Sequence, residues 1–135
     1  MFERCLYFNV NSFTRKVNKI WGDAFQSLGF SPAHAYLLRL VLEQPGLTQK
    51  EIASELSLEK STITRFVDAL EERGYLLRKR NGREQVIFPT KMSIMIEREL
   101  NTKGEELYQT MIESIGKDKL IKLVNQIRRT NEALK

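Results

Sequence analysis

The chain has 135 residues, of which 41% are hydrophobic and 29% are charged. These values indicate one globular domain rather than a disordered chain. The net charge of +5 and the isoelectric point of about 9.4 favour an anionic partner.

The single cysteine, Cys5, excludes an internal disulfide and the usual zinc clusters. No apolar run approaches the roughly 18 residues of a membrane helix, and residues 1–30 lack the apolar core of a signal peptide. We therefore expect a cytoplasmic protein with no membrane partner, no metal and no cofactor.

Two helices are predicted before residue 45. The first covers about residues 5–28, where apolar residues recur every three or four positions, close to a heptad repeat. Ser31 and Pro32 begin the second as N-cap and first residue, and it extends to about Glu43. The Pro45-Gly46 pair then breaks the chain.

A pair of shorter helices follows. Thr48 and Glu51 have the spacing of a capping box, which predicts a helix start. We expect Ser57 to be the N-cap of the next helix and Gly74 to end it. In the helix between Ser57 and Gly74, the apolar residues Ile63, Phe66, Val67 and Leu70 follow the i, i+3, i+4, i+7 pattern of a buried face.

The opposite face of this helix carries small hydroxyl and basic side chains in its N-terminal half, namely Lys60, Ser61, Thr62, Thr64 and Arg65. Such groups suit base edges and phosphates. The acids Asp68, Glu71 and Glu72 lie in the C-terminal half. Only the N-terminal half is therefore expected to enter a major groove, as recognition helices do.

Residues 75–88 are predicted to form a β-hairpin, because Asn81-Gly82 between two β-favouring runs is typical of a type I′ turn. This turn would pair Arg80 with Arg83 and Leu77 with Val86. One face would then be apolar, and the other would carry Arg78, Arg80, Arg83 and Gln85. We interpret the basic face as a wing against phosphates, with Arg83 a candidate for the minor groove.

Charge supports this interpretation. Residues 73–91 contain six basic residues against one acid, Glu84, a surplus that equals the net charge of the whole chain, +5. Localised positive charge is typical of a surface that binds a polyanion.

Two further helices are predicted, from Thr90 to about Ile115 and from Lys117 to about Leu134. The inward residues of the first are expected to be Met92, Met95, Ile96, Leu100, Leu107, Met111 and Ile115. The terminal helices carry more apolar surface than the middle of the chain could cover, and exposed apolar stripes attract a partner. A two-fold homodimer would bury them and place two recognition helices on half-sites about one DNA turn apart.

The segments Leu47–Ala53 and Ser61–Arg78 resemble the MarR family of winged-helix regulators, and the order of helices on both sides is also similar. The wing is shorter here than in the family, at Asn81-Gly82-Arg83, and Phe88-Pro89-Thr90 follows it. The resemblance implies a homodimeric transcriptional regulator, usually a repressor, often released from DNA by a small anionic ligand.

The predicted fold class is mainly α with a small β-hairpin wing. Residues 1–135 form a single MarR-like domain, with a winged-helix part at about 31–90 and dimerisation helices at about 1–30 and 91–135. The predicted function is a repressor that binds an inverted-repeat DNA operator as a homodimer. The predicted DNA contacts are Lys60, Ser61, Thr62, Thr64, Arg65, Arg78, Arg80 and Arg83.

Other interpretations remain open. A small-molecule effector is a candidate partner, with Arg15, Trp21, His34 and Tyr36 as candidate pocket residues. A redox-sensing regulator using Cys5 and a winged helix for protein–protein contact are the alternative functions. No phosphate loop, nucleophile motif or paired carboxylate indicates an enzyme, so no catalytic residue is predicted.

Overall fold

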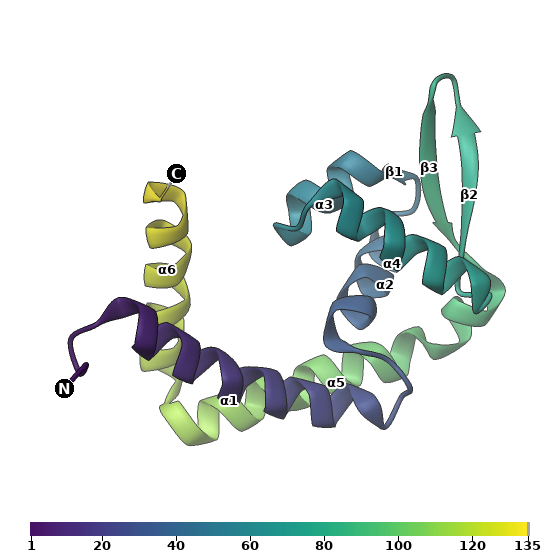
Figure 1. Ribbon diagram of the computed structural model, residues 1–135. Coiled ribbons are helices and arrows are strands. Elements are labelled where there is room, and N and C mark those ends of the chain that lie inside the picture. The colour runs from purple at the N-terminus through teal and green to yellow at the C-terminus, as the bar shows by residue number, and fades with distance from the viewer. Residues whose placement is uncertain (135) are drawn as a thin grey trace. The chain divides into compact units, whose positions relative to one another are not determined.

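The computed structural model describes residues 1–134 and contains two compact units, one of residues 1–101 and one that begins at residue 102. The first unit holds helices α1 (Leu6–Gln26), α2 (Pro32–Glu43), α3 (Gln49–Leu56) and α4 (Lys60–Glu72), and strands β1 (Leu47–Thr48), β2 (Leu76–Asn81) and β3 (Glu84–Pro89). Helix α5 (Lys91–Ile115) begins in the first unit, and the second unit holds its remainder and α6 (Lys117–Ala133). The predicted fold class, mainly α with a β-hairpin, is confirmed (Figure 1).

The core of the first unit lies where α2, α3, α4 and the sheet meet. Helix α2 contributes Leu37, Leu38 and Val41, all fully buried. Helix α4 contributes Ile63, Val67 and Leu70 of its predicted stripe, also fully buried, whereas Phe66 is only half-buried. Strand residues Leu76 and Ile87 close this core from the hairpin side. Burial of each such side chain contributes on the order of 1.5–3 kcal/mol, so this cluster holds the four elements in place.

The ends of α2, α3 and α4 follow local sequence signals. The Ser31 hydroxyl accepts a hydrogen bond from the His34 amide, and Thr48 and Glu51 form the predicted capping box. Helix α4 ends in a Schellman motif, in which the amides of Gly74 and Tyr75 donate to the carbonyls of Glu71 and Leu70. Gly74 has a φ of +86°, which favours glycine.

Ser57 is not the N-cap that the sequence predicted. It closes α3 in the left-handed conformation, with φ 54° and ψ 46°, and Glu59 precedes α4. The turn between the two helices needs one left-handed residue, and a short polar side chain tolerates that conformation better than a branched one.

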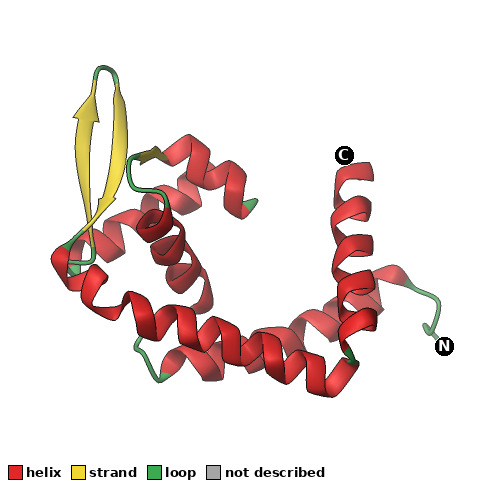
Figure 2. Ribbon diagram, turned by 180° about the vertical axis from the view of Figure 1, so that it is seen from behind, coloured by secondary structure: helices red, strands yellow, loops and turns green. Residues whose placement is uncertain are grey.

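The sheet is antiparallel with the order β1-β3-β2 (Figure 2). Its short first strand, β1, was not predicted. Leu47 pairs with Ile87, and Thr48 pairs with Val86. The two residues before α3 are thereby tied to the hairpin. A two-residue strand carries almost no periodic signal in sequence, so only its partner strand identifies it.

The predicted hairpin register is wrong by two positions. Asn81 pairs with Glu84, and Arg80 with Gln85, so Gly82 and Arg83 form the turn. Only Gly82 of these two has a positive φ, +67°, which fits a type II′ turn rather than type I′. The side chain of Arg80 therefore lies across from the amide of Gln85, and Arg83 lies in the turn instead of opposite Arg80.

The apolar stripes of the terminal helices are largely exposed. In α1, Leu6 is 64% exposed and Phe13 is 43% exposed. At the start of α5, Met92 and Met95 are exposed, contrary to the prediction that they point inward, whereas Leu100 is buried as expected. In the second unit, α6 has no buried residue within the part of the helix that is described. No helix within residues 1–134 is both long and apolar enough to cross a membrane.

Candidate nucleic-acid interface

Helix α4 presents its predicted polar face outward. Lys60, Ser61 and Arg65 are exposed, while Ile63 and Val67 on the other side are fully buried. Because the buried stripe fixes the rotation of the helix, the exposed set is held in a defined direction. The N-terminal half of α4 therefore offers hydroxyl and cationic donors to solvent, as the sequence predicted.

Two threonines of this face have partners within the protein. The Thr64 hydroxyl lies 3.0 Å from the Gln49 side-chain oxygen and 3.0 Å from the Lys60 carbonyl. It links α3 to α4 and is half-buried. The Thr62 hydroxyl lies 3.5 Å from the Arg65 guanidinium, at the limit of a hydrogen bond, so Arg65 is left free to reorient toward a ligand.

The hairpin extends beyond α3 and α4 (Figure 1) and carries Arg80 and Arg83 near its exposed end. Neither guanidinium forms an ion pair with any side chain in residues 1–134. Both are available to an external anion, and their contact with DNA stays a prediction.

Arg78 differs from these two arginines. Its side chain is only 16% exposed, and its guanidinium binds the carboxylates of Glu71, at 2.7 Å, and Asp68. It also donates to the Thr64 carbonyl at 3.4 Å. We predicted that Arg78 holds a DNA phosphate, whereas the structure engages it within the protein, where it joins β2 to α4.

A cavity of about 260 Å³ lies between α3, α4 and the turn of the hairpin. Its lining residues are Thr48, Gln49, Lys50, Lys60, Arg83, Glu84 and Gln85. It brings together two predicted contact residues from separate elements, Lys60 and Arg83. The polar face of α4 and the tip of the hairpin are therefore adjacent surfaces.

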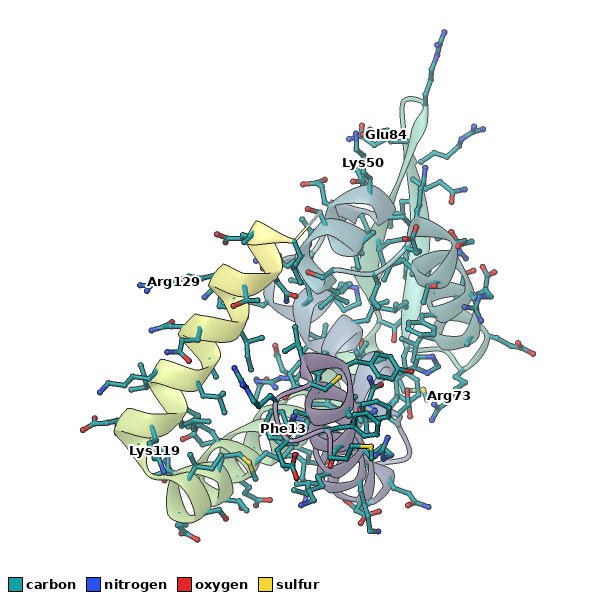
Figure 3. The ribbon with its side chains drawn as sticks, turned by 60° about the vertical axis from the view of Figure 1, so that its left-hand side comes forward. Phe13, Lys50, Arg73, Glu84, Lys119 and Arg129 are labelled. Carbon is teal, nitrogen blue, oxygen red and sulfur yellow. The ribbon has the colours of Figure 1, made fainter. Side chains whose placement is uncertain are left out.

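Two of these lining residues, Gln49 and Lys50, are polar groups that the sequence analysis did not assign to the interface. Lys50 lies in the first turn of α3, next to the capping box. A basic residue at that place was the signal in the sequence that could have identified it as an interface residue. Its proximity to Glu84 (Figure 3) depends on the β1–β3 pairing, which was not predicted.

The four candidate pocket residues are not brought together as one site. The Trp21 indole donates to the Tyr36 hydroxyl at 3.0 Å, so these two do meet. His34 instead packs edge-on against Phe66, with ring centroids 4.6 Å apart. Arg15 forms no hydrogen bond through its side chain and no ion pair within the described chain, and the role of this set stays a prediction.

A second cavity, of about 560 Å³, lies along the C-terminal half of α1 and the loop to α2. It is lined by Asn18, Lys19, Gly22, Asp23, Gln26, Gly29, Phe30, Ser31 and Pro32. None of the four candidate pocket residues lines it.

The electrostatic environment of His34 is distinctive. Burial lowers the pKa of its imidazole, and the positive charge of Arg73 lowers it further. The Arg73 guanidinium lies 4.6 Å from the centre of the Phe30 ring and donates to the Gly29 carbonyl at 3.0 Å. His34 is therefore neutral near pH 7 and belongs to the contact between α2 and α4.

Residues 1–134 contain no group of three or more His, Cys, Asp and Glu side chains that could hold a metal ion. Cys5 is half-buried at the N-cap of α1. A redox role for Cys5 stays a prediction.

The MarR family model matches residues 30–84, the segment from the end of the α1–α2 loop to the turn of the hairpin. An uncharacterized HTH-type transcriptional regulator of Bacillus subtilis (strain 168), YwoH, is 29% identical over 102 residues, covering 74% of each chain.

Two solved structures have the same fold over nearly the whole chain. The transcriptional repressor CouR bound to a 23-mer DNA duplex is 20% identical, with a TM-score of 0.86, covering 96% of this chain and 94% of that one. CouR from Rhodococcus jostii RHA1 bound to p-coumaroyl-CoA is 25% identical, with a TM-score of 0.76, covering 98% and 93%. The winged-helix segment of this chain, residues 30–84, is therefore similar to the MarR family, and the chain as a whole is similar to transcriptional regulators.

Proposed function

We propose that the protein is a transcriptional repressor that binds an inverted-repeat operator as a homodimer. The N-terminal half of α4 enters a major groove, where Ser61, Thr62, Thr64 and Arg65 contact base edges and adjacent phosphates. Lys60, Arg80 and Arg83 hold the phosphate backbone, and Arg83 approaches the minor groove.

The observation that carries this proposal is the shared cavity at the interface. Lys60 begins the recognition helix and Arg83 ends the hairpin turn, yet both line one space. A single rigid surface can therefore present cations and hydroxyl donors to one duplex. Phosphate contacts of this kind fix the register of a protein on DNA, and base contacts supply the sequence preference.

The homodimer is supported by the exposed apolar side chains of α1 and α6, among them Phe13 and Ile127. A two-fold axis between two copies would cover these stripes and set two recognition helices on matching half-sites. Repression and release by a small molecule draw their support from the two CouR structures, one a repressor on DNA and the other a complex with p-coumaroyl-CoA.

The test is selection of bound duplexes from a random pool, followed by sequencing. The expected result is an inverted repeat whose half-site centres are about 10 base pairs, or a multiple of that, apart. A pool with no enriched sequence would contradict the proposal, and an enriched single half-site without symmetry would contradict the dimer. Addition of small aromatic acids to the selected complex then tests ligand release.

A further inference from the structure

Three cations from three separate elements line the cavity of about 260 Å³ described above: Lys50 of α3, Lys60 of α4 and Arg83 of the turn. One acid, Glu84, lies among them. The local charge is therefore positive, and it is built by the tertiary structure rather than by one run of basic residues.

The protein does not neutralise these cations. Lys50, Lys60 and Arg83 have no carboxylate within 4.0 Å in the described residues, whereas Arg78 nearby has two. Figure 3 shows Lys50 and Glu84 side by side, but no ion pair joins them. Like charges gathered without counter-charge repel one another, and an anion among them converts that repulsion into attraction.

The remaining donors suit a tetrahedral oxyanion. The Gln49 side-chain oxygen is held by the Thr64 hydroxyl at 3.0 Å, which leaves its NH₂ group free to donate. Water in the liquid takes up about 30 Å³ per molecule, so a cavity of about 260 Å³ has room for a phosphate group and several waters.

The location of the cavity indicates that the phosphate belongs to the DNA backbone. A duplex that contacts both the start of α4 and the hairpin turn must pass over the space that lies between them. We propose that this cavity holds one backbone phosphate of the bound duplex, with Lys50 as a further DNA-binding residue that shares this phosphate with Lys60 and Arg83. This inference rests on the proposed DNA-binding function and adds α3 to the contact surface.

The negative charge of Glu84 repels a phosphate in this cavity. Removal of that charge should therefore change DNA affinity in the opposite direction to removal of the Lys50 charge. Replacement of the Glu84 carboxylate by an amide removes a repulsive charge and keeps the shape of the side chain. Glu84→Gln should therefore bind DNA several-fold more tightly, while Lys50→Ala should bind several-fold more weakly.

The experiment measures duplex affinity over a range of salt concentrations for both variants and for two matched controls in the second unit, Lys119→Ala and Glu113→Gln. Each phosphate contact contributes about 0.9 to the slope of log K against log salt. Lys50→Ala should lower that slope by about 1 and weaken selected and unrelated duplexes equally. The controls should retain the wild-type affinity and slope, and thermal unfolding should show that all four variants fold.

A second arm locates the phosphate. Neutral methylphosphonates are placed one at a time in the duplex. At one position in each half-site, the methylphosphonate should weaken binding of the wild-type protein but should not further weaken binding of Lys50→Ala. Additive losses at every position would overturn the proposal, as would a Lys50→Ala variant with wild-type affinity and slope. Failure of the wild-type protein to select any duplex would overturn the proposed function itself, so the two failures are distinguishable.

Discussion

At the scale of single residues, arginines that look alike in sequence have different surroundings. Arg78 is held by two carboxylates and is mostly buried, whereas Arg65, Arg80 and Arg83 are exposed. A basic residue on a strand face can form an ion pair within the protein or contact an external ligand. Which of the two it does depends on its neighbours in the folded structure. The prediction for Arg65 follows because its side chain is exposed and free to reorient toward a ligand.

Arg65→Ala should weaken operator binding by about 1–3 kcal/mol and relax the sequence preference, because a side chain that reads a base edge carries both affinity and specificity. Competition binding with operator and single-base variants measures both effects. Arg83→Ala is the comparison, since loss of a phosphate contact should weaken all duplexes evenly. Unchanged discrimination by Arg65→Ala would contradict the assignment.

His34 makes the stability of the fold depend on pH. Burial and Arg73 lower the pKa of this imidazole in the folded protein, so the unfolded chain binds a proton more readily than the folded chain does. The stabilisation is present above the unfolded pKa of about 6.5 and is lost as pH falls through the lower, folded value.

The unfolding free energy, measured by chemical denaturation between pH 7.5 and pH 5, should therefore decrease toward acid. His34→Gln should remove part of that decrease, because glutamine does not titrate in this range. An identical pH dependence in the variant would show that other groups are responsible.

At the scale of elements, the orientation of the hairpin relative to α4 depends on Arg78. Its guanidinium bridges Asp68 and Glu71 of the helix to β2, and its backbone amide lies 3.3 Å from the Glu71 carboxylate. The acids in the C-terminal half of α4 thus have a structural role, which the sequence analysis described only as acidity unsuited to the groove.

The variant Asp68→Asn/Glu71→Gln separates this role from simple electrostatics. Removal of two negative charges would by itself strengthen DNA binding, but loss of the bridge should release the hairpin and weaken binding several-fold. We also expect a loss of about 1 kcal/mol in unfolding free energy, as for partly exposed ion pairs. Glu72→Gln, whose carboxylate forms no ion pair within the described residues, is the control, and tighter binding by the double variant would contradict the positioning role.

At the scale of the whole molecule, the exposed apolar side chains of α1 and α6 lead to the dimer proposal. Leu6 and Val10 line α1 with Phe13, and Val124 and Ile127 line α6, each at least 43% exposed. Stripes of this kind in contact with water lower the solubility of a monomer and favour association.

Light scattering should give about twice the chain mass of 15.8 kDa at micromolar concentration. Phe13→Glu should shift the protein toward monomer, because each dimer loses two buried phenyl rings, about 3 kcal/mol in all or roughly a hundredfold in dissociation constant. Ser12→Glu adds the same charge at an exposed position away from the stripe and should remain dimeric. A wild-type monomer would exclude the proposed assembly.

Much of the fold could be predicted because its signals are local. Caps, the glycine after α4 and the 3.6-residue periodicity act between residues a few positions apart, and the predicted helices agree with the structure to within a few residues. The alternation of side chains between the two faces of the hairpin was also correct, except for Arg83, which lies in the turn, although the register was not. Moving a two-residue turn by one residue shifts each partner by two positions, and side chains alternate with a period of two.

Sequence alone thus determined the helices, the alternation of side chains along the hairpin strands and the polar side of α4, because each depends on neighbours along the chain. Tertiary structure decided the turn at Gly82-Arg83, the pairing of β1 with β3, the engagement of Arg78 by α4, and the approach of Lys50 to the hairpin turn. These features depend on which distant segments meet when the core is buried, and a pattern read along the chain contains no such distances.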